Sequence, residues 1–64
     1  MGLSVEEMRS ELANMDRTGA TLADMENFMS NESMRSDDAS AVYSRYLSVH
    51  NPGEWLENFI DEAD

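Results

Sequence analysis

Cysteine and lysine are both absent from this sequence of 64 residues. Without cysteine, the chain has no disulfide and no cysteine-ligated metal site to stabilise it. A domain of this length buries only about 60% of the surface that its unfolded chain exposes, so its stability is marginal. Small domains of this kind often gain stability by oligomerisation. A homodimer is therefore one expectation from the composition.

Positive charge is scarce along the whole chain. Four arginines stand against fourteen aspartates and glutamates, which gives a formal net charge of −10. Proteins bind nucleic acid largely through Lys and Arg side chains that neutralise phosphates, and an anionic membrane would repel the same excess of acid. The composition therefore argues against direct nucleic-acid binding and against a membrane partner. It favours a basic protein surface as the partner, although excess acid also serves solubility alone.

Long apolar runs are missing as well. No stretch approaches the apolar core of a signal peptide or the length of a membrane-spanning helix. The missing cysteine leaves the redox compartment open, although it fits a reducing interior at least as well as secretion. The sequence accordingly predicts a cytoplasmic protein.

Residues that commonly carry catalysis or bind metals are few. His50 is the only histidine, and it lies in neither an HxxxH nor an HxxE pattern. A calcium loop beginning at Asp37 would need an oxygen ligand at its fifth position, where the sequence has Ala41. There is also no glycine-rich phosphate loop. We therefore expect no enzymatic activity, no metal and no cofactor.

Apolar residues recur at helical spacing in four segments. We expect helices over residues 4–16, 21–30, 37–49 and 52–63. In the first segment, the apolar residues are separated by three, four and three positions: Val5, Met8, Leu12 and Met15. No segment alternates in the way a half-buried strand does. The sequence predicts a single all-α domain over residues 1–64, built as a small bundle of three to four short helices with no sheet.

Signals for helix ends agree with this pattern. Ser4 is followed by Glu7, and Thr21 by Asp24, in the arrangement of a capping box. Asn51 precedes Pro52, a favoured pair at a helix start. The polar stretch after residue 30 is expected to be a connection, with the methionine inside it, Met34, covering the core.

Methionine and tyrosine residues lie on the expected inner faces. Six methionines give either an adaptable core or an exposed groove for a partner helix, and we favour the core. Leu47 is expected on the inner face of the third helix. Tyr43 and Tyr46 are expected at the edge of the core with their hydroxyls in water.

The last segment carries a row of acids. Glu54, Glu57, Asp61 and Asp64 are spaced by three, four and three residues, so a helix aligns them on one side. Like charges at this spacing destabilise a helix, and acids near its end oppose the helix dipole. Such local conflicts often mark functional sites, although the acids of a terminus are often simply solvated. The candidate partner-binding residues are Glu54, Glu57, Asp61, Glu62, Asp64, Asp37 and Asp38.

Size and charge together suggest a class of function. We expect a small acidic helical interaction protein that binds a basic, nucleic-acid-binding surface of a partner and inhibits or regulates it, as phage-encoded inhibitors and antitoxins do. This is an analogy at the level of class. Carboxylates about 5–6 Å apart at their Cβ atoms have a spacing similar in scale to backbone phosphates, so the row is also a candidate nucleic-acid mimic.

Two other interpretations stay open. The chain is alternatively a dimerising structural or assembly module with an apolar interface through Trp55, Phe59 and the methionines. Its acidity would then serve only solubility. The absence of lysine is also compatible with a salt-adapted protein.

Overall fold

The computed structural model describes residues 2–62, which form four α-helices and no strand. Their bounds are α1 Val5–Arg17, α2 Leu22–Ser33, α3 Asp37–Ser48 and α4 Pro52–Asp61. The predicted all-α bundle of short helices is confirmed over this part of the chain. α1, α3 and α4 begin and end close to their predicted bounds, whereas α2 continues past the predicted end at residue 30.

Reciprocal hydrogen bonds fix the starts of α1 and α2. The backbone N–H of Glu7 donates to Ser4 Oγ over 3.2 Å, and the N–H of Ser4 donates to Glu7 Oε1 over 3.0 Å. Thr21 and Asp24 form the same pair of bonds, both of 3.2 Å. Each pair satisfies backbone donors that have no partner inside the helix. Both predicted capping boxes are therefore present. In the second box, Asp24 forms the same reciprocal bonds that Glu7 forms in the first.

α3 begins at a cap that the sequence reasoning did not identify. Ser36 Oγ accepts from the N–H of Ala39 over 3.0 Å and donates to the carbonyl oxygen of Leu3 over 2.8 Å. One hydroxyl therefore caps α3 and ties it to the segment before α1. Asp37 and Asp38 follow in the first turn, where negative charge is favoured by the helix dipole.

The connection between α2 and α3 is shorter than predicted. α2 extends through Ser33, whose hydroxyl donates to the carbonyl oxygen of Ser30 over 2.7 Å. Met34 lies just beyond the helix end with 82% of its surface exposed. The prediction that Met34 covers the core is therefore wrong, because the extra helical turn leaves the residue in a tight turn that faces solvent.

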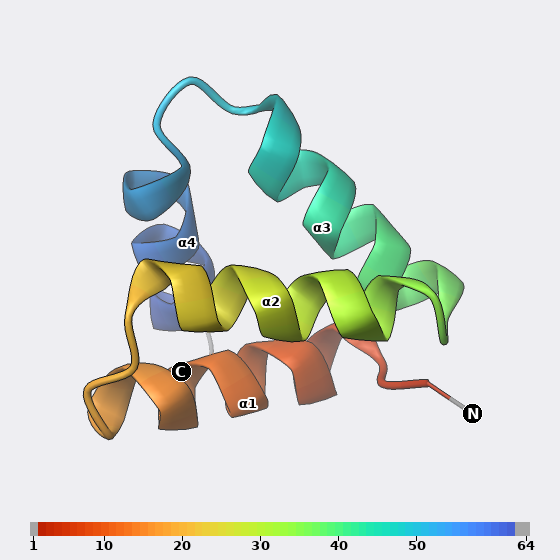
Figure 1. Ribbon diagram of the computed structural model, residues 1–64, viewed down its shortest axis with the longest axis horizontal. Coiled ribbons are helices and arrows are strands. Elements are labelled where there is room, and N and C mark those ends of the chain that lie inside the picture. Colours follow the sequence, from red (N-terminus) through yellow and green to blue (C-terminus); the bar gives the residue numbers. More distant parts are fainter. Residues whose placement is uncertain (1, 63–64) are drawn as a thin grey trace.

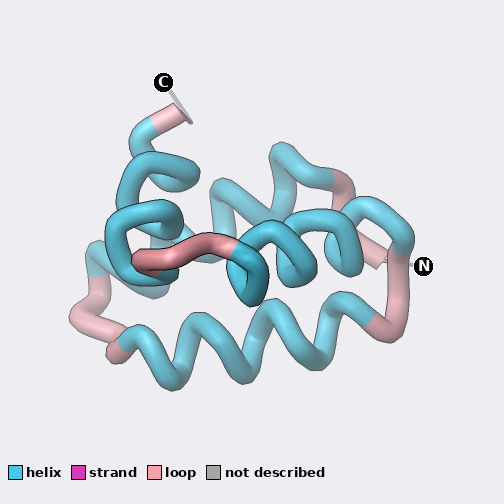
Figure 2. Tube along the Cα trace, turned by 90° about the horizontal axis from the view of Figure 1, so that it is seen from above, coloured by secondary structure: helices cyan, strands magenta, loops and turns pink. Residues whose placement is uncertain are grey.

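The four helices pack against one another as a small bundle (Figure 1). α1 and α2 run in opposite directions, one above the other, and the left-handed backbone of Gly19, with φ of 87°, lies in the turn between them. α3 packs most extensively on α2, while α4 crosses the end of the bundle where α1 finishes and packs mainly on α1 and α3. The tube in Figure 2 shows the same arrangement from above, with α4 at one end. All four helices enclose one core.

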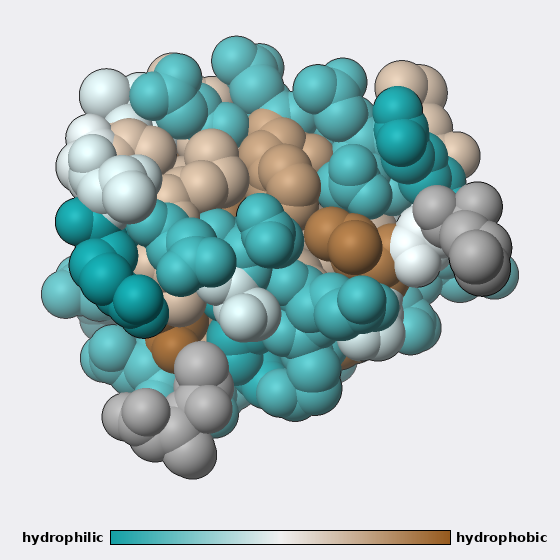
Figure 3. Space-filling model, turned by 90° about the horizontal axis from the view of Figure 1, so that it is seen from below, coloured by the Kyte–Doolittle hydropathy of each residue, from teal (hydrophilic) through white to brown (hydrophobic). Residues whose placement is uncertain are grey.

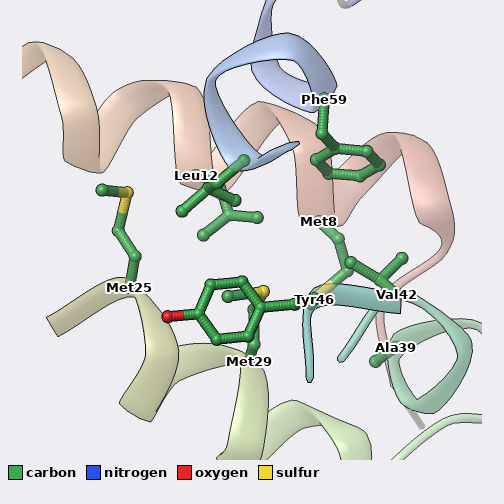
Figure 4. Close-up of a cluster of buried hydrophobic side chains, with 9 residues drawn as sticks. Met8, Leu12, Met25, Met29, Ala39, Val42, Tyr46 and Phe59 are labelled. Atoms are coloured by element: carbon green, nitrogen blue, oxygen red, sulfur yellow. The ribbon is translucent and has the colours of Figure 1, made fainter. Parts of the chain in front are cut away.

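Nine buried side chains make up this core (Figure 4). They are Met8, Leu12, Met25, Met29, Ala39, Val42, Tyr46, Leu56 and Phe59. Three of the six methionines are among them, which favours the adaptable core over an exposed methionine groove. Leu47 differs from its prediction, since 59% of its surface is exposed. The buried stripe of α3 runs through residues 39, 42 and 46, and the next position along the chain points away from it.

Tyr46 is a core residue, contrary to the expectation that it lies at the edge. Its ring lies among Leu12, Met25 and Met29 in Figure 4. Its hydroxyl donates to Glu26 Oε1 of α2 over 3.1 Å, which replaces the water partner that burial removes. Burial, and then the hydrogen bond to Glu26, raises the pKa of Tyr46 above the ordinary value of 10.0.

This raised pKa predicts a loss of stability at alkaline pH. The folded state disfavours ionised Tyr46, so the stabilisation is complete below pH 10 and is lost as the pH rises through the higher folded pKa. The Tyr46→Phe variant should lose about 1 kcal/mol at neutral pH through the missing hydrogen bond. Its free energy of unfolding, measured in urea at several pH values, should then fall less above pH 10 than that of the wild type. Equal alkaline losses in both proteins would contradict this assignment.

Polar side chains dominate the face drawn in Figure 3. Apolar side chains appear there as a short band and isolated spots between hydrophilic ones. Within residues 2–62, every helix is too short or too polar to cross a bilayer.

Candidate acidic interface on the last helix

α4 is anchored by one face and leaves its acids on the other. Asn51 Oδ1 accepts from the N–H of Glu54 over 3.4 Å, and Pro52 occupies the first turn. Leu56 and Phe59 are buried in the core. The four described acids of the helix and its end are all exposed: Glu54, Glu57, Asp61 and Glu62. The helix spacing predicted from the sequence is therefore present, while Asp64 lies outside the described residues.

Among the four described acids of α4 and its end, Glu57 and Asp61 are the two whose side chains have no polar partner. Neither side chain forms an ion pair or a hydrogen bond with another residue in the described range 2–62. Glu54 is partly engaged, since Asn51 Nδ2 lies 3.5 Å from its Oε2. Residues 57 and 61 are four positions apart on one helix, so their carboxylates project side by side. They form the most available part of the predicted row.

Arg9 of α1 engages the other end of the row. Its Nη2 donates to Glu62 Oε2 over 3.3 Å, and its Nη1 donates to Glu6 Oε1 over 2.6 Å. Its Nε donates to the backbone carbonyl oxygen of Phe59 over 2.9 Å, and its guanidinium carbon lies 4.5 Å from the centre of the Phe59 ring. Only 12% of the Arg9 side chain is exposed. Arg9 therefore fastens α1 to the end of α4.

This contact changes the interpretation of Glu62. The last carbonyls of a helix lack donors within the helix, and positive charge is favoured there. Arg9 supplies both a donor and a charge, so the acid at residue 62 no longer opposes the helix end unaided. Glu62 differs in this respect from Glu57 and Asp61. This role of Arg9 was not predicted from the sequence. The only signal for it was the spacing of four residues from Val5, which places Arg9 on the apolar side of α1.

Asp37 and Asp38 do not join the acids of α4. They lie at the start of α3, beside the end of α2, whereas α4 lies at the opposite end of the fold (Figure 1). Both side chains are exposed. The structure therefore separates the six predicted residues that it describes into two groups, and the second consists of these two acids.

A small hollow adjoins Glu57 where α1, α2 and α4 meet. It has a volume of about 260 Å³ and is lined by Asp16, Leu22, Met25, Gly53, Leu56, Glu57 and Ile60. Asp16 lies near the end of α1 and is exposed. The sequence reasoning missed Asp16, although its spacing of four residues from Leu12 places it on the side of α1 that carries this core residue. The fold thus adds a second carboxylate to the surface near Glu57.

A larger hollow lies on the other side of α4, between α1 and α3. It has a volume of about 370 Å³ and is lined by Val5, Arg9, Ala41, Val42, Arg45, Trp55, Asn58, Phe59 and Glu62. The rings of Trp55 and Phe59 stack in it, with centres 5.2 Å apart and planes 9° apart. The two sides of α4 therefore differ in charge, because, within residues 2–62, one hollow is lined by two acids and no cation, and the other by two arginines and one acid, Glu62.

No family model, curated protein or solved structure matches the chain.

The acids near α4 are arranged as pairs. Among residues 2–62, no group of three or more histidine, aspartate or glutamate residues is placed to hold a metal ion. The acids near α4 instead lie as pairs on an exposed helix and beside a shallow hollow. A pair of carboxylates supplies fewer ligands than the oxygen shell of a calcium ion requires.

Proposed function

We propose that this protein is a small acidic interaction module that binds a basic surface of a partner protein. By occupying that surface it inhibits or regulates the partner, in competition with nucleic acid, as phage-encoded inhibitors and antitoxins do. The proposal places this action in the cytoplasm and involves binding without catalysis or a cofactor. The observation that carries it is the exposed pair Glu57 and Asp61, which has no cation beside it within residues 2–62.

Electrostatics supports a basic partner. Two like charges at this helical spacing repel each other, and a cation of the partner relieves that repulsion. The net charge of −10 attracts basic surfaces over a distance and speeds their encounter, and salt weakens this attraction. The same charge disfavours nucleic acid and anionic membranes as direct partners. Binding should therefore weaken as the salt concentration rises.

Packing makes the alternative dimer interface less suitable. Phe59 is buried in the core of the chain, together with Met8, Met25 and Met29. Trp55 is half-buried and stacked on Phe59. Most of the apolar surface assigned to a dimer is thus already covered within one chain, whereas the acids of α4 remain exposed.

Reversal of the exposed pair tests the proposal. We expect the variant with Glu57→Lys and Asp61→Lys to lose at least about tenfold in affinity for the partner, because attraction becomes repulsion at the point of contact. The immobilised protein, at low salt, captures basic proteins from cells of the source organism. Calorimetry with the identified partner, and displacement of labelled DNA from it, then measure binding and competition.

A matched control carries the same change in net charge elsewhere. Glu11→Lys alters an exposed acid of α1, and Glu32→Lys alters a half-buried acid near the end of α2. Neither acid forms an ion pair within residues 2–62, and the end of α2 lies far from α4 (Figure 1). This control should retain affinity within about threefold, since only the long-range attraction changes. Circular dichroism should give the same helix content for all three proteins. Equal affinity of the wild type and the α4 variant would reject the proposal.

A further inference from the structure

The hollow beside Glu57 combines open apolar surface with acids on two sides. Leu22 has 42% of its surface exposed, one of three large apolar residues in the described range with such exposure. Beneath it lie Met25 and Leu56, which are buried, and Ile60 is half-buried at the side. The hollow therefore has an apolar floor, of which mainly the exposed part of Leu22 is open to solvent.

Two carboxylates from different helices border this floor. Asp16 belongs to α1 and Glu57 to α4, and both are exposed. Neither has a cationic partner within residues 2–62. Their relative position is fixed by the packing of α1 on α4, which Arg9 fastens at the other end of α4. Helix packing consequently places two acids at the same hollow.

We propose that this hollow receives one arginine side chain from the basic partner. The inference rests on the proposed function and specifies its point of contact. Arginine has an apolar stem that lies well on apolar surface and a charged head that stays at the edge. Its planar guanidinium donates along several directions and is less strongly hydrated than the lysine ammonium, so it can pair with two carboxylates at once. A volume of about 260 Å³ has room for a single side chain and excludes a helix.

A short peptide serves as the probe. A capped peptide of alternating arginine and glycine is titrated at low salt into the protein labelled with ¹⁵N, and amide shifts are followed by NMR. We expect saturable shifts at Asp16, Leu22, Gly53 and Glu57. The matching peptide with citrulline in place of arginine keeps the shape without the charge, and it should bind at least about tenfold more weakly. A lysine peptide should fall between the two.

Gly53 allows the hollow to be filled without altering any acid. A Cβ atom at this position would lie 3.9 Å from Leu22 Cδ2 and 3.9 Å from Asn51 Oδ1, which is ordinary contact. Gly53→Ala therefore leaves the hollow open and controls for the loss of glycine. Gly53→Leu projects a larger side chain into it, and should weaken binding of the arginine peptide about tenfold relative to Gly53→Ala.

Asp16→Asn gives an independent test, because it removes one border charge without touching α4. We expect it to weaken the arginine peptide several-fold. One outcome is normal binding of the arginine peptide by both Gly53→Leu and Asp16→Asn, with binding lost in the Glu57→Lys, Asp61→Lys variant. This outcome would overturn the hollow as the arginine site, while the proposed function stands. Normal binding by all three variants would overturn both.

Discussion

We expect the Leu12→Ala variant to lose about 2–5 kcal/mol of stability at 25 °C. Leu12 has no exposed surface, and it packs in the core between the helices. Truncation of such a leucine removes buried apolar surface and leaves a cavity, which together cost about 2–5 kcal/mol. A domain of this length has a total stability of about 3–10 kcal/mol, and small domains lie toward the lower end. The loss is thus comparable with the whole stability.

Leu47→Ala provides the matched control for this prediction. The chemical change is identical, but 59% of the Leu47 surface is exposed on α3. Its effect on the free energy of unfolding should be within about 0.5 kcal/mol. Urea titrations followed by circular dichroism measure both variants. If the two substitutions cost the same, the division between buried and exposed leucines in this fold is wrong.

The second large effect is expected for Arg9→Ala, at about 2–3 kcal/mol of stability. The variant removes the charged hydrogen bond to the Phe59 carbonyl, the contact with the Phe59 ring and the only ion pairs formed within residues 2–62. The partners Glu6 and Glu62 are largely exposed, so these ion pairs contribute little. Most of the loss comes from the carbonyl at the end of α4 and from the packing of the guanidinium, which is mostly buried.

Two further arginine variants separate these contributions. Arg9→Lys keeps the charge but lacks the planar group that reaches three acceptors, so it should recover about half of the loss at most. Arg35→Ala removes an exposed arginine from the turn after α2 and should change stability by less than about 0.5 kcal/mol. Thermal unfolding of the three variants gives the comparison. A loss for Arg35→Ala equal to that for Arg9→Ala would indicate a general effect of net charge in place of a specific contact.

α4 connects stability with the proposed binding surface. Its buried residues Leu56 and Phe59 hold it in the core, and Arg9 holds its end. The acids Glu57 and Asp61 therefore sit on a helix whose orientation is fixed before any partner arrives. Preorganised groups bind with a smaller loss of conformational freedom than mobile ones. A flexible acidic tail would give the same attraction with less specificity.

Local physics explains why the sequence determined the helices and one part of the candidate site. Capping residues such as Ser4 and Thr21 act within three positions, and the apolar spacing acts within one helix. Glu57 and Asp61 lie next to each other because of the same helical geometry. These features depend on residues close in the chain, so they could be predicted without knowledge of how the helices pack.

Only the tertiary structure decided which side of each helix meets which neighbour. Arg9 bonds to the carbonyl oxygen of Phe59, a residue 50 positions away in the sequence. The same side chain pairs with Glu62, which is therefore not an unpaired acid. Asp16 meets the hollow beside Glu57, while Asp37 and Asp38 lie at the other end of the fold. The spacing of apolar residues within one segment predicts that a helix has an apolar face. The angle at which two helices cross depends on how the side chains of both helices fit together. That fit placed the acids relative to one another and to the arginines.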